Sequence, residues 1–285
     1  MSIIRKVFDS KGGPLLAATF LFLFIAESRR QLRKRKEQKE KRVIINSIVA
    51  IPSFGLLRFA FLPAMVWLAM KNKKLKWGLN YRLNSAPPLK WILAFLIMDY
   101  TNYLWHVLNH KIPLLWRFHV VHHSDRDLDL STAIRFHFGE LIGSIFYRGL
   151  FIFLSGASAR QVLVYEVLFE GATQFHHTNW KLPFKLEKNL NKVIVTPRMH
   201  GIHHSEIKEE TDSNYSVIFS FWDRLHQTLK LNINQDDVVI GVPAYANANE
   251  LTAGYLLTMP FGEIREWDAD KLKRLSINTT LPQKS

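Results

Sequence analysis

The chain has 285 residues, twelve of them histidine and none cysteine, with a formal net charge of +14 and a pI near 9.9. The lack of cysteine excludes disulfides, thiolate-bound zinc, iron–sulfur clusters and cysteine nucleophiles, so any metal must be held by nitrogen and oxygen. The charge alone would suit nucleic acid, but no zinc-finger, RNP or basic-zipper pattern is present. Long apolar stretches favour a membrane, because basic segments flank membrane spans and face anionic lipid.

Residues 13–27 form a nearly uninterrupted apolar run, somewhat short for a span of about 20 residues. Basic residues precede it, as in a signal peptide, but no small-residue cleavage site is visible before Glu27 and positive charge follows directly. We therefore expect an uncleaved membrane helix. Residues 28–42 then hold nine Lys or Arg against two Glu, which is typical of a cytosolic topology anchor and also of a solvated helical face.

Residues 43–70 are apolar again and contain Pro52 and Pro63, which predict kinks or a broken helix. The stretch is long enough to span a bilayer, or to enter and leave it on one side as a re-entrant element. Four lysines follow between Lys71 and Lys76. If the stretch spans and the preceding basic segment is cytosolic, these lysines lie outside, against the positive-inside tendency.

Residues 89–110 predict a long helix that is apolar at its start and polar towards its end. Asp99, Asn102, His106 and His110 are three or four residues apart and form one polar stripe. Such a stripe must face protein or metal, because lipid cannot satisfy it.

Residues 141–154 and 159–175 predict an apolar helical pair around a Ser-Gly-Ala turn. Glu166 and Glu170 interrupt the second helix at (i, i+4) spacing. Carboxylates within a membrane are candidates for function, but a surface position at the end of the hairpin explains them equally well. We do not count them as catalytic residues.

Eleven of the twelve histidines lie between His106 and His204, and most form short clusters. Residues three and four apart share a helix face, so each cluster is expected to aim two or three imidazoles at one point. Neutral imidazole binds borderline transition metals well, and eight or more ligands are too many for one four-coordinate zinc. The pattern predicts two metals; scattered structural histidines are the alternative. The clusters are His106 with His110, then His119, His122 and His123, then His176 with His177, and then His200, His203 and His204.

The order of motifs is WHVLNH, WRFHVVHH, RFHFGE, FHHTNW, TPRMHGIHHS and NYSVIFSFWDRLHQT, from about His106 to Thr228. In this order and spacing the chain resembles the fatty acid hydroxylase/sterol desaturase superfamily of membrane-bound, histidine-rich di-iron oxygenases. It departs from that pattern at Phe138, where proline is usual, and in LHQT, where glycine often precedes the final threonine.

The resemblance implies a set of metal ligands and no catalytic group beyond them. Carboxylates and amides beside the ligands would fix the tautomers of their imidazoles, and Glu140, Asn179 and Asp223 are candidates for this role; a plain salt bridge or helix cap is the alternative for each. His176 is interpreted as a structural neighbour, and His226 as a residue that does not bind metal. The implied ligands are His106, His110, His119, His122, His123, His137, His177, His200, His203 and His204.

The expected fold is all-α: an integral membrane helical bundle of about four spanning or re-entrant helices with a cytosolic, histidine-rich helical catalytic cap. Residues 1–90 would form N-terminal membrane helices and a basic loop, 91–230 a fatty acid hydroxylase-type catalytic domain, and 231–285 a soluble C-terminal tail. With residues 28–42 in the cytosol and 43–70 spanning, every histidine cluster reaches the cytosolic side of a bacterial inner membrane or an endoplasmic reticulum.

The implied function is hydroxylation or desaturation of a lipid C–H bond, in a sterol, fatty acyl chain or related lipid, with O₂ and two external electrons. Two iron ions are the implied cofactor, and zinc can displace iron in purified protein. No fused cytochrome-b5-like H-P-G-G motif is present, so a separate cytochrome b5-, ferredoxin- or flavoprotein-type donor is expected. The alternative is a metal-binding membrane protein without oxygenase activity, such as a zinc-dependent hydrolase or transporter, although H-E-x-x-H is absent.

Overall fold

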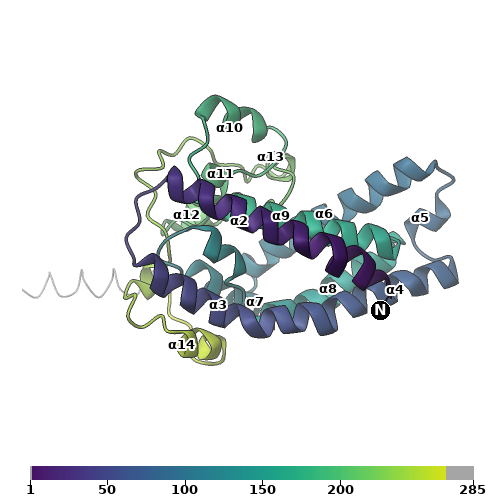
Figure 1. The fold of residues 1–285 in the computed structure, drawn as a ribbon, viewed down its shortest axis with the longest axis horizontal. Coiled ribbons are helices and arrows are strands. Elements are labelled where there is room, and N and C mark those ends of the chain that lie inside the picture. Colours follow the sequence, from purple (N-terminus) through teal and green to yellow (C-terminus); the bar gives the residue numbers. More distant parts are fainter. Residues whose placement is uncertain (1, 268–285) are drawn as a thin grey trace, which may run out of the picture.

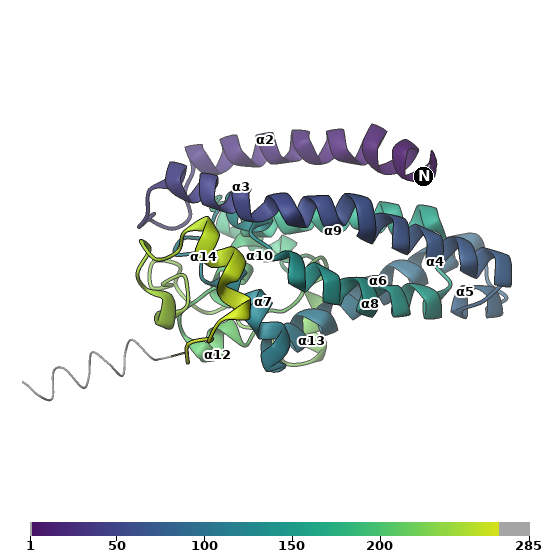
Figure 2. The same cartoon turned by 90° about the horizontal axis from the view of Figure 1, so that it is seen from below.

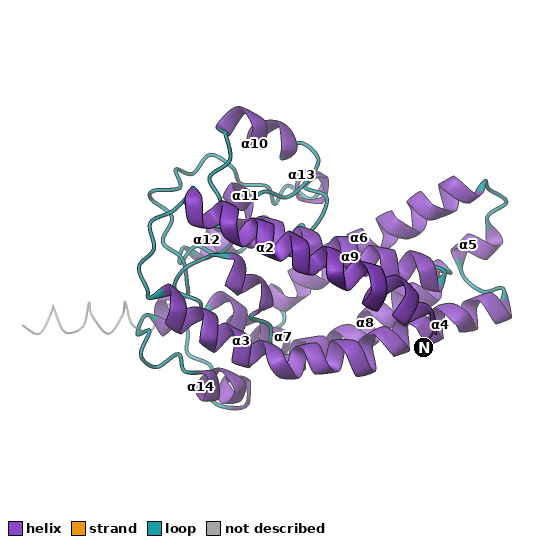
Figure 3. Ribbon diagram, viewed as in Figure 1, coloured by secondary structure: helices purple, strands orange, loops and turns teal. Residues whose placement is uncertain are grey.

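The computed structural model describes residues 2–267, and the elements in that part of the chain are helices joined by loops (Figures 1 and 3). The long helices run side by side along the long axis of the molecule, and most of the short helices gather at one end of them. The long helices are α2 (Gly13–Arg29), α3 (Lys39–Leu56), α4 (Leu62–Leu75), α6 (Pro87–Lys111), α8 (Phe138–Ser155) and α9 (Ala159–His177).

The shorter elements complete the chain. They are α1 (Ser2–Ile4), η1 (Arg5–Gly12), η2 (Leu57–Phe61), α5 (Leu79–Arg82), α7 (Pro113–His123), η3 (Leu130–Ile134), α10 (Phe184–Leu190), α11 (Pro197–His203), α12 (Lys208–Thr211), α13 (Phe221–Leu225), η4 (Pro243–Tyr245), α14 (Ala253–Thr258) and η5 (Met259–Phe261).

Within residues 2–267, three helical stretches are long and apolar enough to cross a membrane: Ser2–Arg29, Lys39–Arg82 and Phe138–Ser155. Only 11%, 17% and 28% of their most apolar windows are buried inside the protein, so most of this apolar surface faces outward. Water does not tolerate so large an apolar surface, whereas lipid does. The expected membrane helical bundle is therefore confirmed, and Figure 2 shows α2 along its outside.

The two prolines of the second stretch do not break it. Helical backbone continues from α3 through η2 into α4, and the disturbance takes the form of the π-helical segment η2. The wider π turn accommodates Pro63, whose ring would otherwise clash with the carbonyl four residues earlier. The 37 residues from Lys39 to Leu75 rise about 55 Å, which exceeds a hydrocarbon core of about 30 Å, so this stretch is no re-entrant hairpin.

The expected hairpin is also present, as α8 and α9. Gly156 ends α8 with φ +71°, a conformation that glycine adopts without strain. Ser158 then caps α9: its side chain accepts from the Gln161 N–H, and the Gln161 side-chain oxygen accepts from the Ser158 N–H. Both helices pack with α4 and α6 on a core that includes Met65, Ile152 and Leu163.

The basic segment after α2 lies against the histidine-bearing end of the bundle and is only partly solvated. Gln31 forms a β-bridge with Trp180, just after α9. The buried Arg33 donates to the Gln235 side chain at 2.6 Å. The histidines and this basic segment therefore lie at the same end of the long helices. The prediction that residues 28–42 form a solvated helical face is wrong for the loop between α2 and α3. The proposed division at residues 90 and 230 stays a prediction.

A buried ion pair ties α3 to the loop that follows the first H-x-x-H-H motif. Arg42 Nε and Nη2 donate to the two carboxylate oxygens of Asp125 at 2.7 and 2.8 Å, and Arg42 Nη1 donates to Asp129 at 2.7 Å. Asp125 is 1% exposed and Arg42 6%. This arginine holds the pKa of the Asp125 carboxyl well below its usual range, against the opposing effect of burial.

Replacement of Asp125 by asparagine should destabilise the protein by about 3 kcal/mol, because it leaves the buried Arg42 charge only partly compensated. Thermal unfolding in detergent measures the effect as a lower midpoint. Asp236→Asn is the matched control, since Asp236 is exposed, and it should leave the midpoint unchanged. An Asp125→Asn variant that melts like the wild type would show that the pair does not stabilise this end of the bundle.

Candidate metal centre

The histidines come from the ends of four helices. The last turns of α6 carry His106 and His110, and the last turn of α9 carries His176 and His177. The short helices α7 and α11 supply the two H-x-x-H-H motifs, with His204 as the C-cap residue of α11.

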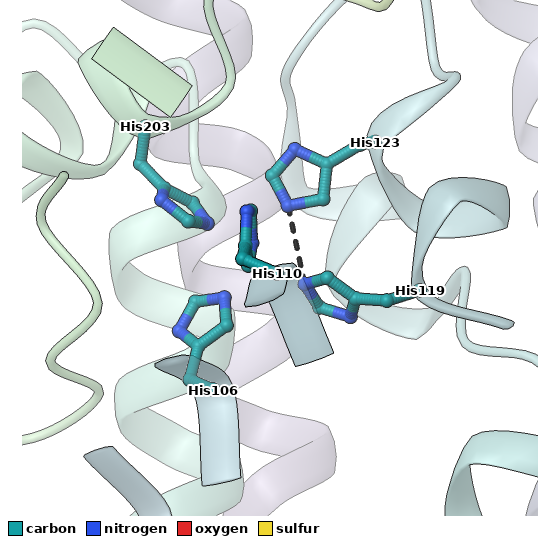
Figure 4. Close-up of side chains that lie close together, drawn as sticks. All are labelled: His106, His110, His119, His123 and His203. Atoms are coloured by element: carbon teal, nitrogen blue, oxygen red, sulfur yellow. Dashed lines mark hydrogen bonds between the residues drawn. The ribbon is translucent and has the colours of Figure 1, made fainter. Parts of the chain in front are cut away.

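Nine histidines form two buried groups whose ligand-capable nitrogens all lie within 4.8 Å of one another in each group. Figure 4 shows the rings of the first group turned towards a common centre. The two groups adjoin, because the His123 ring of the first stacks on the His204 ring of the second at 4.4 Å between centroids. The first group is His106, His110, His119, His123 and His203, and the second is His122, His177, His200 and His204.

Each H-x-x-H-H motif is divided between the two groups. The (i, i+4) pair His119 and His123 belongs to the first group, whereas His122 belongs to the second. The other motif reverses this, with His200 and His204 in the second group and His203 in the first. The expectation that each cluster aims at a single point is therefore wrong for these two motifs, because positions i+3 and i+4 lie on opposite sides of position i around a helix.

The spacing of the ring nitrogens fits metal coordination. In the second group, His177 Nε2 lies 3.0 Å from Nε2 of both His122 and His200, and His200 Nε2 lies 3.1 Å from that of His204. Nitrogens bound at about 2.1 Å to one metal ion lie roughly 3 Å apart when they are neighbouring ligands. In the first group, the buried Nε2 atoms of His110 and His203 have no hydrogen-bond partner among the described residues. The donor set fits nitrogen-bound metal ions in both groups.

Backbone carbonyls orient several of these rings. The Nδ1 atoms of His106, His177 and His203 each donate at 2.7 Å, to the carbonyls of Tyr215, Thr173 and Ser213 respectively. With the proton held on Nδ1, the lone pair of each ring is on Nε2, which faces the centre of its group.

The Glu140 carboxylate contacts a ring directly. Its Oε2 accepts from His119 Nδ1 at 3.1 Å, and its Oε1 accepts from Asn109 Nδ2 at 3.1 Å. Asn109 lies one residue before His110, so this pair of hydrogen bonds links α6, α7 and α8 around the first group.

Asp223 and Asn179 bond to backbone groups near the histidines and not to the imidazole rings themselves. Asp223 accepts from the backbone N–H groups of Tyr215 and Ser216 at 2.9 Å, and so holds the segment whose carbonyl orients His106. Asn179 instead pairs with the basic segment, donating to the Arg33 carbonyl and accepting from the Arg33 N–H, each at 2.8 Å. Asn179 therefore positions the chain after α9 and contacts no imidazole in the described part.

His137, His176 and His226 lie outside both groups. His137 accepts from the Gly139 N–H at 3.0 Å as the N-cap of α8, while its Nε2 donates to the Leu257 carbonyl at 3.1 Å. Both ring nitrogens are thus engaged, and we propose that His137 caps α8 rather than binding metal. His176 donates to the Val217 carbonyl beside the second group, and the exposed His226 contacts Tyr100.

Burial lowers the pKa of several imidazoles in the two groups. Desolvation lowers the pKa of His122, His123 and His204 well below the ordinary value, and neighbouring histidines lower it further. The pKa of His203 falls to about 3, again mainly through burial. Neutral rings have free lone pairs at physiological pH, so protons do not compete with a metal ion for them.

An apolar pocket opens beside the histidines. Asn102, Trp105, Phe136, Glu140, Phe169 and Thr173 line it, together with histidines of both groups. The same six residues also line a larger pocket between α3, α6, α8 and α9. The histidines therefore face a space that continues into the helical bundle.

Comparison with known proteins agrees with this geometry. Residues 91–228 match the family model described as fatty acid hydroxylase. The chain is similar to proteins of the fatty acid hydroxylase/sterol desaturase superfamily. Both histidine groups lie within the matched residues of this fatty acid hydroxylase domain.

Several curated relatives are similar to the chain. Human alkylglycerol monooxygenase is 30% identical over 60% of this chain and 38% of its own length. The ornithine lipid hydroxylase OlsE of Rhizobium tropici is 28% identical over 60% of this chain and 50% of its own. Human cholesterol 25-hydroxylase is 24% identical over 52% of this chain and 55% of its own. The chain thus spans about half or less of these relatives' lengths, and no solved structure matches it.

Sequence reasoning missed two kinds of group in this domain: the Asp212 carboxylate, whose Oδ1 lies 3.6 Å from His110 Nδ1, and several backbone carbonyls. The Ser213 and Tyr215 carbonyls orient one histidine each, although neither side chain suggests such a role. Their only signal is a location in the final motif, before Asp223, which fixes the Tyr215 and Ser216 N–H groups.

Acid should destabilise the metal-free domain. The unfolded chain takes up protons near the ordinary histidine pKa of 6.5, whereas folded His203 takes one up only near 3. The free energy of unfolding therefore falls as the pH is lowered between these values. Melting midpoints of the metal-free protein from pH 7 to pH 4 measure the loss. His203→Gln should show a shallower loss, and His226→Gln the wild-type loss; equal profiles for all three would contradict the effect of burial.

Proposed function

We propose that the protein is a membrane-bound non-haem di-iron monooxygenase that hydroxylates a C–H bond of a lipid with O₂ and two external electrons. Two adjoining groups of buried, neutral imidazoles that face an apolar pocket carry this proposal. The relatives point the same way, since their names refer to oxygenation of alkylglycerol, ornithine lipid and cholesterol. These names favour hydroxylation over desaturation.

Two iron ions are the proposed cofactor, one held by each histidine group. A reduced iron pair supplies the electrons and the oxidising power that no side chain provides for attack on an unactivated C–H bond. Five nitrogens in the first group and four in the second suit nitrogen-rich coordination of one ion each. His119 is held in place by Glu140, and His106 and His203 by backbone carbonyls.

The chain's other contribution is to bind the substrate and keep water out. Trp105, Phe136 and Phe169 line both the pocket beside the histidines and the larger pocket between α3, α6, α8 and α9, which we call the membrane-level pocket. An apolar wall of this kind excludes bulk water from the reacting carbon and admits a lipid chain from the bilayer side. The electrons would come from a separate cytochrome b5-, ferredoxin- or flavoprotein-type protein.

The function is tested with purified, iron-reconstituted protein, a chemical reductant and a panel of membrane lipids under ¹⁸O₂. We expect close to two irons per chain and one ¹⁸O atom in a hydroxylated product. His203→Ala should abolish oxidation and lower iron content, because it removes a nitrogen of the first group. His226→Ala is the matched control and should retain both. Bound zinc with hydrolysis of a lipid and no ¹⁸O incorporation would favour the zinc-hydrolase alternative.

We further propose that the histidine end faces the cytosol, of a bacterial inner membrane or of the endoplasmic reticulum. Residues 28–42, at the histidine end, hold nine Lys or Arg. The opposite end of the long helices, where α4 ends, has four lysines between Lys71 and Lys76. The larger basic cluster favours the cytosolic side.

The absence of cysteine makes this orientation simple to test. Single variants Lys34→Cys and Lys74→Cys place one exposed thiol at each end of the helices. In intact cells or sealed microsomes, a membrane-impermeant maleimide should label one variant only. Labelling of Lys74→Cys in intact bacteria, or of Lys34→Cys in microsomes whose cytosolic face is outward, agrees with the proposal; the reverse pattern contradicts it.

A further inference from the structure

The membrane-level pocket contains charged groups at the end away from the histidines. This pocket is open at its mouth, so a segment of a lipid chain can enter it. Ala50, Phe54 and Leu57 form its wall on the α3 side. Arg148 and Glu170 line the same pocket, on α8 and α9.

Arg148 is fixed in place by its neighbours. It is 7% exposed and donates through Nη2 to Glu166, which is 1% exposed and lies one helical turn before Glu170. Its guanidinium also lies 4.7 Å from the centre of the Phe61 ring and 5.0 Å from that of Phe169. An arginine has five N–H donors, so donors remain for a ligand beside the Glu166 pair.

Glu170 lines the pocket and makes no hydrogen bond or ion pair within the described residues. A purely apolar lipid chain packed against it would remove water from a carboxyl group and return nothing, which is energetically unfavourable. The part of the substrate that occupies this end therefore has to carry a hydrogen-bonding group.

The local charges select which group that is. Arg148 already balances Glu166, so a carboxylate or phosphate would bring a further negative charge beside Glu166 and Glu170. An ammonium would pair with Glu170 only while that carboxyl is ionised, and it would lie beside the Arg148 cation. A hydroxyl can donate to an ionised carboxylate or accept from a protonated one, and it can accept from the guanidinium, so it fits in every protonation state.

We propose that Arg148 and Glu170 form the recognition site for a neutral hydroxyl group of the lipid substrate. The substrate class is thus a lipid alcohol, bound with its hydroxyl within the helical bundle and its apolar part directed to the histidines. This proposal rests on the proposed oxygenase function, because it names that enzyme's substrate class. Binding of the alcohol at this site can nevertheless be measured without turnover.

The placement has a geometric consequence. Glu140, which touches His119, lies eight residues before Arg148 on α8, a rise of about 12 Å. The carbon presented to the metal groups is therefore remote from the recognised hydroxyl, several methylene groups along the chain.

Binding is tested with the full-length, iron-loaded protein in nanodiscs, without reductant, by displacement of tritiated 1-hexadecanol. The competitors are unlabelled 1-hexadecanol, hexadecane, palmitate and hexadecylamine, which share one chain length. We expect the alcohol to compete about tenfold better than the others, as one hydrogen bond to a charged group provides. The proposal is overturned if 1-hexadecanol shows no saturable binding. It is also overturned if palmitate or hexadecylamine displaces the tritiated alcohol more strongly than unlabelled 1-hexadecanol does.

Variants locate the preference. Glu170→Leu should reduce the preference for the alcohol to about twofold or less, whereas Glu170→Gln, which keeps hydrogen-bonding atoms, should retain most of it. Glu209→Leu is the control, because Glu209 is exposed and does not line this pocket. An unchanged preference in Glu170→Leu overturns the assignment of this residue.

Turnover separates this inference from the proposed function. A preference for the alcohol in protein that oxidises no lipid supports the recognition site and counts against the oxygenase. In active protein, oxidation of 1-hexadecanol should occur many carbons from its hydroxyl. Oxidation within the first three carbons of the alcohol overturns the placement while leaving the oxygenase intact.

Discussion

The structure depends on the burial of nine neutral imidazoles around two centres. Desolvation alone would make so many buried polar rings unfavourable, so each needs a partner for each nitrogen. Backbone carbonyls and Glu140 take one nitrogen of His106, His119, His177 and His203. One nitrogen of each of the nine rings lies within 4.8 Å of those of the other rings in its group, where a cation can satisfy several lone pairs at once. Metal binding and folding of this end are therefore coupled.

The division of the two H-x-x-H-H motifs makes the two groups inseparable. Each motif gives an (i, i+4) pair to one group and its middle histidine to the other. A shift of α7 or α11 would therefore disturb both groups together. The network of Arg42 with Asp125 holds the end of α7 in position, and Asp223 holds the segment that orients His106. Such rigid support is what a reaction at a fixed carbon atom requires.

The long helices serve two environments at once. Their outer surfaces are apolar and face lipid, as Phe59, 78% exposed, and Phe146, 75% exposed, illustrate. Their inner surfaces become polar towards one end, where α6 and α9 deliver histidines. The pocket between α3, α6, α8 and α9 connects these environments, so a lipid can reach the two histidine groups without crossing water.

The helical membrane bundle, the α8–α9 hairpin and the buried polar stripe of α6 can be predicted from the sequence alone, because they follow from hydrophobic runs, a Gly-containing turn and helical periodicity. The three- and four-residue spacing of the histidines likewise predicted that their clusters bind metal. Only the tertiary structure decided which histidines share a group, since His122 and His123 are neighbours in the chain but face different centres. It also placed His137 at the cap of α8 and assigned carbonyls of residues 213 and 215 to ring orientation. Partners this distant in sequence depend on how the helix ends meet, which spacing along one helix does not encode.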